Sequence, residues 1–314
     1  MKAVLHYRAS PGFRAILDAA KLPGMSLDIV DETDNVAFAR AMRDADVLLH
    51  VLRTVTKSDI AASPRLRLIQ KIGVGVNTID LEAAKSSGVA VCNMPGTNTR
   101  AVAEMTLTLM FAALRRISVF DPQTRRGEGW QLAPSDIDNV GEIGGRVVGF
   151  LGYGAVPRCL APALLALGAE ILYTSRTEKK DAAGRFASLD ELLSGADILS
   201  LHVPSTPETR GAIGADAISR MKPRAILINT ARGDLVDESA LAAALRSGRL
   251  AAAGLDVYSR EPAGADNPLF DLPNVVLTPH IAWLTPETLK RSMVVAMENC
   301  RRVEANETLL HRVV

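Results

Sequence analysis

The chain has 314 residues, which is long enough for two domains that each bury a core of ordinary size. Its 36 Lys and Arg residues nearly balance 35 Asp and Glu residues, so the charge favours a small-molecule partner over nucleic acid or an anionic membrane. The three cysteines lie far apart and indicate neither a disulfide framework nor a metal site. Because no apolar stretch is long enough to cross a bilayer and the first residues contain no leader-like apolar run, we expect a soluble cytoplasmic protein.

Short apolar runs alternate with helix-like segments in the first third of the chain, which is the pattern of a parallel α/β sheet. The predicted strands are Ala3–Tyr7, Leu27–Val30, Val47–His50, Leu68–Ile72 and Val89–Val91. The predicted helices between them are Phe13–Ala20, Val36–Arg43 and Leu81–Ser86. These elements predict a first doubly wound sheet.

A long helix is predicted from about Arg100 to Ile117, with Asp121-Pro122 as its stop signal, and the polar stretch Arg125–Gly145 after it has little periodicity. A second parallel sheet is predicted from the strands Val147–Leu151, Glu170–Thr174, Ile198–His202, Ala225–Asn229, Gly254–Val257 and Val275–Thr278. The final helix, from Pro286 to about Asn306, is apolar on one face and can return to the first sheet. We therefore expect one domain from residues 1–98 and 285–314, and a second domain from residues 99–284.

The segment Gly152-Tyr153-Gly154-Ala155-Val156-Pro157 follows a predicted strand and opens a helix. Gly152 permits a tight turn, and Gly154 lets the backbone approach a pyrophosphate that the N–H groups at the start of the helix would hold. Pro157 is allowed in a first helical turn but removes one of those N–H donors. The pattern predicts a Rossmann-type cofactor domain, inserted here into a flavodoxin-like substrate domain.

The residues that follow the next predicted strand are Ser175, Arg176 and Thr177. Sites for NAD(H) usually place an acidic residue there to bind the ribose 2′-hydroxyl. An arginine flanked by two hydroxyl donors suits a 2′-phosphate better, so the sequence favours NADP(H) over NAD(H). The alternative interpretation is an ordinary polar loop that contains one arginine.

Arg232, Glu261 and His280 each follow a predicted strand of the second sheet. Ligands of doubly wound sheets bind at the carboxyl ends of the strands, so these three side chains can converge. Arginine can hold a carboxylate with two hydrogen bonds, histidine can transfer the proton that accompanies hydride transfer, and a carboxylate can orient that histidine. Each residue alone has an ordinary structural explanation, and the combination is what indicates a dehydrogenase.

With these residues the chain resembles the D-isomer-specific 2-hydroxyacid dehydrogenase family over most of its length. Further matching segments are Lys71–Asp80, Asn93–Thr99, Ala103–Thr106 and His202–Gly211. The resemblance implies that Arg232 binds the carboxylate of a 2-oxo acid, that His280 is the general acid/base and that Glu261 is its partner. It also implies a second group of carboxylate contacts, from the backbone of Val74, Gly75 and Val76. The cofactor contacts it implies, with Asp256 near the nicotinamide carboxamide, are Thr106, Val203, Pro204, Thr209, Thr230, Ala231 and Asp256.

The same resemblance implies a homodimer, because Arg100–Arg146 corresponds to much of the dimer interface in this family. It also implies an active-site cleft between the two domains of each subunit. Ala282-Trp283 resembles the pattern of the glyoxylate and hydroxypyruvate reductases within the family. Trp283 then either lines the substrate pocket or serves structural packing.

We therefore expect an NAD(P)-dependent enzyme that uses NADPH to reduce a small 2-oxo acid, of the glyoxylate or hydroxypyruvate kind, to the D-2-hydroxy acid. One alternative is the same fold acting on phosphite or phosphoglycerate. Another is a dinucleotide-sensing binding protein that resembles the C-terminal-binding corepressors. Arg53 follows a strand of the first domain, where it either reaches an acidic or phosphorylated substrate tail or makes a surface or interdomain contact.

Overall fold

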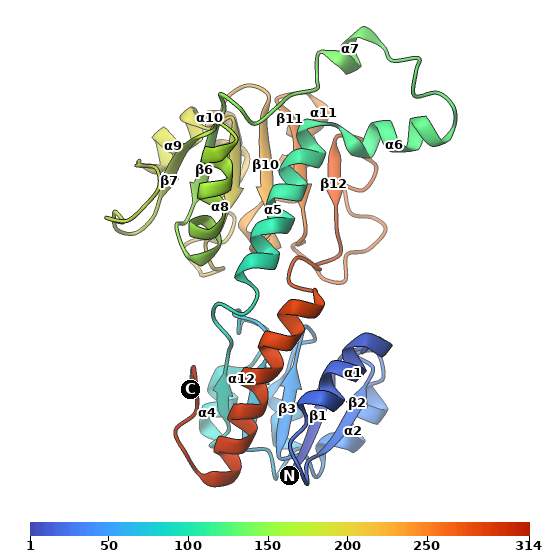
Figure 1. Ribbon diagram of the computed structural model, residues 1–314, viewed down its shortest axis with the longest axis vertical. Coiled ribbons are helices and arrows are strands. Elements are labelled where there is room, and N and C mark those ends of the chain that lie inside the picture. Colours follow the sequence, from blue (N-terminus) through green and yellow to red (C-terminus); the bar gives the residue numbers. More distant parts are fainter. The chain divides into compact units, whose positions relative to one another are not determined.

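The computed structural model describes residues 1–314, with the side chain of Ser135 outside the described part. Ser135 belongs to the segment predicted to form a dimer interface, so that prediction lies partly outside the described residues. The chain divides into two compact units: unit 1 comprises Met1–Asn98 and Trp283–Val314, and unit 2 comprises Thr99–Ala282. Each unit is built on its own parallel sheet (Figure 1), so the predicted fold class of two parallel-sheet α/β domains is confirmed. Trp283 and Leu284 belong to unit 1, whereas the sequence pattern placed them in the second domain.

Unit 1 contains a five-stranded parallel sheet in the order β2-β1-β3-β4-β5. Its strands are β1 Lys2–His6, β2 Ser26–Val30, β3 Val47–His50, β4 Leu68–Lys71 and β5 Ala90–Cys92. Its helices are α1 Pro11–Ala20, α2 Asn35–Met42, α3 Lys57–Ala61, α4 Leu81–Ser86 and α12 Pro286–Ala305.

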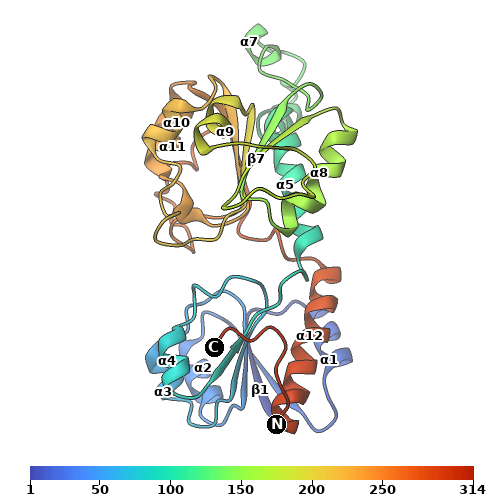
Figure 2. The ribbon, with the colours of Figure 1, turned by 90° about the vertical axis from the view of Figure 1, so that its left-hand side faces the viewer.

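Helices cover both faces of the unit 1 sheet, as Figure 2 shows with α1 and α12 on one side and α2, α3 and α4 on the other. The central strands β3 and β4 are buried along their whole length. Strands buried on both faces are mainly apolar, and the runs Val47–Leu49 and Leu68–Ile69 made these strands predictable, although His50, Gln70 and Lys71 at their carboxyl ends are buried polar residues. Phe38 of α2 and Ile60 of α3 pack with Val4 of β1 in the core of one face.

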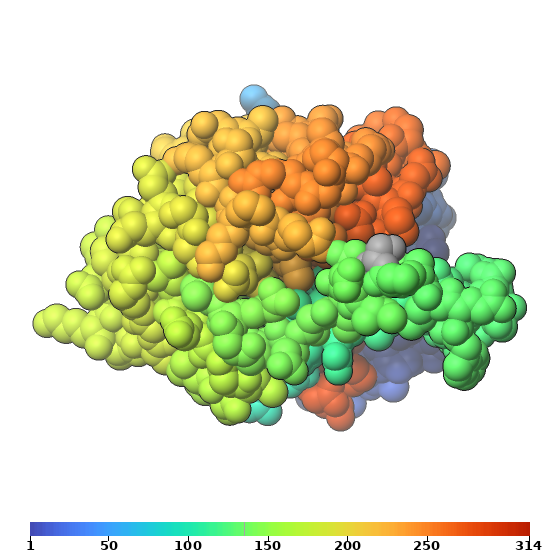
Figure 3. Space-filling model, turned by 90° about the horizontal axis from the view of Figure 1, so that it is seen from above, coloured from blue at the N-terminus to red at the C-terminus, as the bar shows by residue number. Residues whose placement is uncertain are grey.

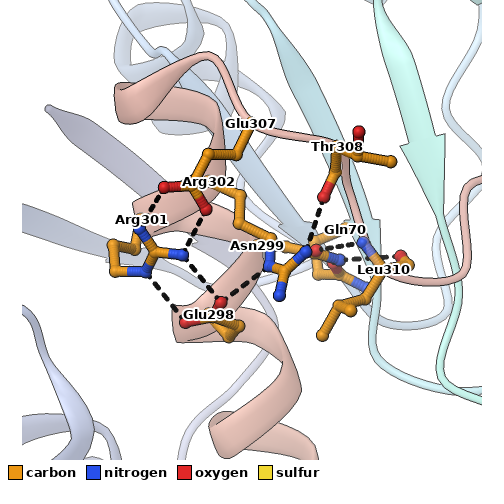
Figure 4. A network of polar contacts seen from close by, with 8 residues as sticks. All are labelled: Gln70, Glu298, Asn299, Arg301, Arg302, Glu307, Thr308 and Leu310. Atoms are coloured by element: carbon orange, nitrogen blue, oxygen red, sulfur yellow. Dashed lines mark hydrogen bonds and ion pairs between the residues drawn. The ribbon is translucent and has the colours of Figure 1, made fainter.

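A polar network fastens the end of α12 to the sheet of unit 1 (Figure 4). The Asn299 side chain donates to Gln70 Oε1 at 2.6 Å, and its own oxygen accepts from the backbone N–H of Leu310 at 2.8 Å. Asn299 and Gln70 are both fully buried. Around them, Arg301 pairs with Glu298 and Glu307 at the surface. The network holds the C-terminal segment against unit 1.

Unit 2 contains a seven-stranded parallel sheet in the order β12-β11-β10-β9-β6-β7-β8. Its strands are β6 Val147–Leu151, β7 Glu170–Thr174, β8 Arg185–Phe186, β9 Ile198–Leu201, β10 Ala225–Asn229, β11 Leu250–Leu255 and β12 Val275–Leu277. Its helices are α5 Thr99–Leu114, α6 Ile117–Arg125, α7 Pro134–Ile137, α8 Ala155–Ala166, α9 Leu189–Gly195, α10 Ala215–Arg220, α11 Glu238–Arg246 and the short 3₁₀ turn η1 Gly233–Leu235.

The sheet of unit 2 lies between α5 and α8 on one face and α9, α10 and α11 on the other (Figures 1 and 2). Gly254 of β11 lets α5 approach closely, because a Cβ atom at that position would lie 2.9 Å from the Cβ of Leu109. The run of small residues in β11 therefore packs against a helix.

The structure corrects two local expectations. The predicted helix from Arg100 to Ile117 ends at Leu114, because Arg116 adopts a left-handed conformation (φ 52°), and α6 then begins at Ile117 with Pro122 inside it. The expected strand Gly254–Val257 is instead Leu250–Leu255. In the described part of the chain, no helix is both long and apolar enough to cross a membrane.

Candidate active site

The predicted cofactor and catalytic residues of unit 2 follow the carboxyl ends of parallel strands. The glycine turn follows β6, Ser175 follows β7 and Arg232 follows β10. Asp256 follows β11, and His280 follows β12. Since all seven strands run parallel, these segments share one edge of the sheet, where ligands of such sheets bind.

The glycine turn has the backbone geometry that a pyrophosphate site requires. Gly152 has φ 95°, and a Cβ atom there would lie 2.8 Å from the carbonyl oxygen of His202. Gly154, the N-cap residue of α8, has no heavy atom within 4 Å of an added Cβ and carries no side-chain cap. Open space therefore lies in front of an uncapped helix N-terminus, where N–H groups attract anions. Pro157 is buried in the first turn of α8, as expected, and cannot contribute an N–H group.

The loop after β7 contains the residues predicted to select the cofactor. Arg176 and Thr177 are exposed. The Ser175 hydroxyl donates to the Thr177 carbonyl oxygen at 2.6 Å, so the hydroxyl proton of Ser175 already has an acceptor within the loop. The position where an acidic residue would bind a 2′-hydroxyl is occupied by this serine.

A short loop between β10 and η1 positions Arg232. The side chain of Asn229 accepts from the N–H of Ala231 at 3.0 Å and donates to the carbonyl oxygen of Arg232 at 2.8 Å. At Gly233, a Cβ atom would overlap backbone atoms of Tyr258, so only glycine allows the two loops to touch. The loop of Arg232 is thereby held against the loop that carries Glu261.

His280 and Glu261 form a direct pair, with Nδ1 of His280 2.6 Å from Oε2 of Glu261. Both side chains retain some exposure, 22% for His280 and 32% for Glu261. The other carboxylate oxygen of Glu261 accepts from the N–H of Tyr258 at 3.0 Å, which fixes the carboxylate in place. The hydroxyl of Tyr258 donates to the Thr278 carbonyl oxygen at 3.0 Å and joins the two loops a second time. Burial raises the pKa of Tyr258 to about 12, so this hydroxyl keeps its proton at neutral pH.

Charge and burial oppose each other at Glu261 and Arg232. Burial acts to raise the pKa of Glu261, but its hydrogen bond to His280 and the nearby positive charges outweigh this effect and leave the pKa below its ordinary value. Burial lowers the pKa of Arg232, against the opposing influence of Glu261 and Asp234. A guanidinium that has lost part of its hydration gains strongly from an anionic ligand.

Asp256 organises the segment that carries His280. One carboxylate oxygen accepts from the hydroxyl of Thr278 at 2.6 Å and from the N–H of Ile281 at 2.9 Å, and the other accepts from the N–H of Ala282 at 2.9 Å. Asp256 is fully buried, and burial raises its pKa. His280 lies between these hydrogen-bonded residues and has a left-handed backbone conformation (φ 55°). Its own N–H donates to the Asp256 carbonyl oxygen at 2.8 Å.

The other predicted cofactor residues lie near this edge as well. The hydroxyls of Thr106 and Thr230 are 2.8 Å apart, which joins α5 to the loop after β10, next to Ala231. After β9, the hydroxyl of Thr209 donates to the carbonyl oxygen of Pro204 at 2.7 Å and closes the loop that begins at Val203.

The remaining predicted substrate residues belong to unit 1. Val74, Gly75 and Val76 follow β4 in a loop with exposed or half-buried positions. Arg53 follows β3, with its guanidinium 5.1 Å from the centre of the Phe38 ring and a buried Nη1 atom that has no hydrogen-bond partner. Trp283 is 7% exposed, and its ring packs edge-on against Tyr7 at 5.9 Å.

Sequence reasoning missed the residues that position the site. Asn229 and Tyr258 hold the loops of Arg232 and Glu261, and no sequence motif indicates either role. Tyr153 of the glycine turn is a third such residue, because its hydroxyl accepts from the N–H of Ala183 at 2.9 Å. Their partners lie in other loops, so no local pattern identifies them.

Known proteins resemble this chain in sequence and in fold. The family model described as "D-isomer specific 2-hydroxyacid dehydrogenase, NAD binding domain" matches residues 107–282. The chain is 42% identical to a glyoxylate reductase of Aeropyrum pernix over 266 residues, which cover 82% of this chain and 79% of that protein. It is 39% identical to a D-3-phosphoglycerate dehydrogenase of Mycobacterium leprae over 285 residues, or 88% of this chain, and spans only 53% of that longer protein.

Among solved structures, the TT0316 protein from Thermus thermophilus aligns over the full length of both chains, with a TM-score of 0.90 and 34% identity. The family suggested by the sequence motifs is confirmed by these matches. This chain belongs to the D-isomer specific 2-hydroxyacid dehydrogenase family.

Proposed function

We propose that this protein reduces a small 2-oxo acid, of the glyoxylate or hydroxypyruvate kind, to the D-2-hydroxy acid with NADPH as the electron donor. The observation that carries the proposal is the pair of His280 and Glu261, 2.6 Å apart at the ligand-binding edge of unit 2. It is supported by Arg232, whose loop is packed against theirs through Gly233.

Each residue of this group has a distinct role in the proposed reaction. Arg232 holds the substrate carboxylate and polarises the carbonyl group. The bound nicotinamide supplies the hydride that adds to the carbonyl carbon. His280 gives a proton to the carbonyl oxygen, and Glu261 orients the imidazole and balances its charge. The products are the 2-hydroxy acid and the oxidised cofactor.

The preference for NADPH rests on the loop after β7. Arg176 is exposed there, and no acidic side chain occupies the position of Ser175. An arginine at this point stabilises a 2′-phosphate, whereas a 2′-hydroxyl calls for a carboxylate acceptor. Gly152, Gly154, Ala155 and Val156 form the proposed pyrophosphate contact.

A second candidate substrate class is favoured by Arg53. Its guanidinium carries a permanent positive charge and lies 5.1 Å from the centre of the Phe38 ring. A 2-oxo acid with a second anionic group, such as the phosphorylated substrates implied by the names of the D-3-phosphoglycerate dehydrogenases, would be attracted by that charge. Trp283 packs on Tyr7, so we assign it to the support of unit 1.

We also propose that the chain forms a homodimer through the segment Arg100–Arg146. Large apolar side chains are exposed in this segment, at Phe111, Ile117, Trp130, Leu132, Ile137 and Val140. The green segment that carries most of them lies at the surface in Figure 3. Exposed apolar groups gathered in one segment are typical of an association surface.

The test of the homodimer is its mass in sedimentation. The wild-type protein should have twice the chain mass, and Trp130→Glu should shift the measured mass toward that of one chain. A monomeric wild-type protein would refute the proposed homodimer.

The central test is a matrix of substrates and cofactors. Glyoxylate, hydroxypyruvate, pyruvate, phenylpyruvate and a phosphorylated 2-oxo acid are each assayed with NADPH and with NADH. The proposal predicts the highest kcat/KM for a small 2-oxo acid with NADPH, and it predicts that His280→Ala abolishes most turnover while the protein stays folded. Tight cofactor binding without turnover of any 2-oxo acid would instead favour a dinucleotide-sensing protein.

A further inference from the structure

The loop after β7 contains a lysine whose position is fixed by a buried tyrosine. The hydroxyl of Tyr173 accepts from the N–H of Lys179 at 2.9 Å and lies 3.3 Å from the carbonyl oxygen of the same residue. Tyr173 belongs to β7 and is fully buried. A surface lysine usually has a mobile backbone in such a loop, but here the sheet holds both of its peptide groups.

The side chain of Lys179 points back toward the residues that select the cofactor. Its Nζ atom donates to the hydroxyl oxygen of Thr177 at 3.0 Å. This contact leaves the Thr177 proton free to be donated elsewhere, whereas the proton of Ser175 is used by the Thr177 carbonyl oxygen. Lys179 and Thr177 therefore present donors from the same part of the loop.

The loop is also tied to the glycine turn. The Tyr153 ring of that turn packs on the Tyr173 ring at 4.4 Å, and the Tyr153 hydroxyl accepts from the N–H of Ala183. The nearby carboxylate of Asp181 pairs with Arg158 of α8, whose guanidinium holds the pKa of that carboxyl below its ordinary value. Asp181 is thus already paired with Arg158, a cation other than Lys179.

We propose that Lys179 is a specificity-determining residue that binds the 2′-phosphate of NADPH beside Arg176 and Thr177, and that Tyr173 is the positioning residue that holds it there. The inference rests on the proposed NADPH preference and names the second cation of that site. A dianionic phosphate binds best where more than one positive charge converges, and Arg176 supplies a single charge.

The test compares Lys179→Met with Lys180→Met, a neighbouring exposed lysine of the same charge. Two quantities are measured: the NADPH-to-NADH ratio of kcat/KM, and the calorimetric affinity for adenosine 2′,5′-bisphosphate relative to 5′-AMP. Loss of a charged hydrogen bond predicts that Lys179→Met lowers both ratios about tenfold, and screening of an exposed charge predicts about twofold or less for Lys180→Met. Lys179→Arg should restore most of the preference.

Tyr173→Phe removes only the hydroxyl that fixes Lys179, and it should lower both ratios by about threefold. Equal ratios in wild type and Lys179→Met, in a wild-type enzyme that prefers NADPH, would overturn the inference and leave the cofactor proposal standing. Equal effects of Lys179→Met and Lys180→Met would also overturn it, because the charge would then act without a defined position. A wild-type enzyme that prefers NADH, with no added affinity for the 2′-phosphate, would refute the cofactor proposal itself.

Discussion

Nδ1 of His280 lies 2.6 Å from Oε2 of Glu261, although the two residues are 19 positions apart in the sequence and belong to separate loops. The second oxygen of the carboxylate is held by the backbone of Tyr258, so Glu261 cannot turn away from the imidazole without losing that bond. This arrangement leaves the Nε2 side of the ring as the side that can face a reacting oxygen.

Replacement of Glu261 by glutamine tests whether the charge of this pair is needed. The glutamine side chain keeps a similar shape but cannot balance a positive imidazole, so Glu261→Gln should lower kcat by about 100-fold. Steady-state kinetics measures the effect. Glu238→Gln is the matched control, because Glu238 holds the same loop through the N–H of Ser259 and does not contact His280. Similar losses in both variants would assign Glu261 a purely structural role.

The same variant has a predicted pH dependence. The pKa of Glu261 is lower in the folded protein than its ordinary value of 4.5, so its contribution to the free energy of unfolding is complete above that value. The contribution is lost as the pH falls through the lower folded-state pKa. Urea denaturation should therefore show a constant difference between wild type and Glu261→Gln near neutral pH, and a shrinking difference below about pH 4. A difference that grows in acid would contradict the assigned direction.

Asp256→Ala should damage both stability and catalysis. The variant leaves the part-buried N–H group of Ile281 and the buried N–H group of Ala282 without an acceptor, and the buried group alone costs about 1–3 kcal/mol. It also removes the support for the left-handed backbone of His280, so kcat should fall more than cofactor affinity does. Asp256→Asn keeps one acceptor oxygen and should lie between wild type and alanine. A wild-type kcat in Asp256→Ala would show that the position of His280 does not depend on the hydrogen bonds of Asp256.

The strands that carry the site could be predicted because parallel strands buried on both faces are continuous apolar runs, as in Val147–Leu151 and Ala225–Asn229. The bounds of β11 could not be predicted, because Ala251, Ala252 and Ala253 carry no strand signal of their own. Ala252 and Ala253 belong to the strand through their pairing with β10. The two-residue strand β8 is too short to have a detectable period.

The residues of the candidate site could be predicted from their positions after strands. The hydrogen bonds that hold these residues in place could not be predicted from the sequence. The contacts from Asn229 to Arg232 and from Tyr258 to Glu261 depend on loop conformations that residue order does not reveal. The clash that forbids a Cβ at Gly233 involves the backbone of Tyr258, which belongs to a different loop. Tertiary packing alone creates these constraints.

Asn299→Ala should destabilise unit 1. The side chain is fully buried, and its removal leaves the side-chain oxygen of Gln70 and the N–H of Leu310 without their partners. The expected loss is about 3 kcal/mol, measured from urea denaturation. Arg301→Ala, which breaks only solvent-exposed ion pairs at the same end of α12, should lower the unfolding free energy much less than Asn299→Ala does. Equal losses would mean that the buried amide pair adds nothing beyond surface charge.

The two glycines of the turn after β6 should respond differently to alanine. At Gly154 an added methyl group meets no heavy atom within 4 Å, so Gly154→Ala should change the unfolding free energy by about 1 kcal/mol or less. The methyl group would occupy the space proposed for the pyrophosphate, and the Kd for the cofactor should rise about tenfold or more. At Gly152, φ is 95° and the methyl group would lie 2.8 Å from the carbonyl oxygen of His202, so Gly152→Ala should chiefly lower stability. Fluorescence titration with NADPH and urea denaturation of both variants separate the two effects. Unchanged cofactor affinity in a folded Gly154→Ala protein would place the pyrophosphate away from this turn.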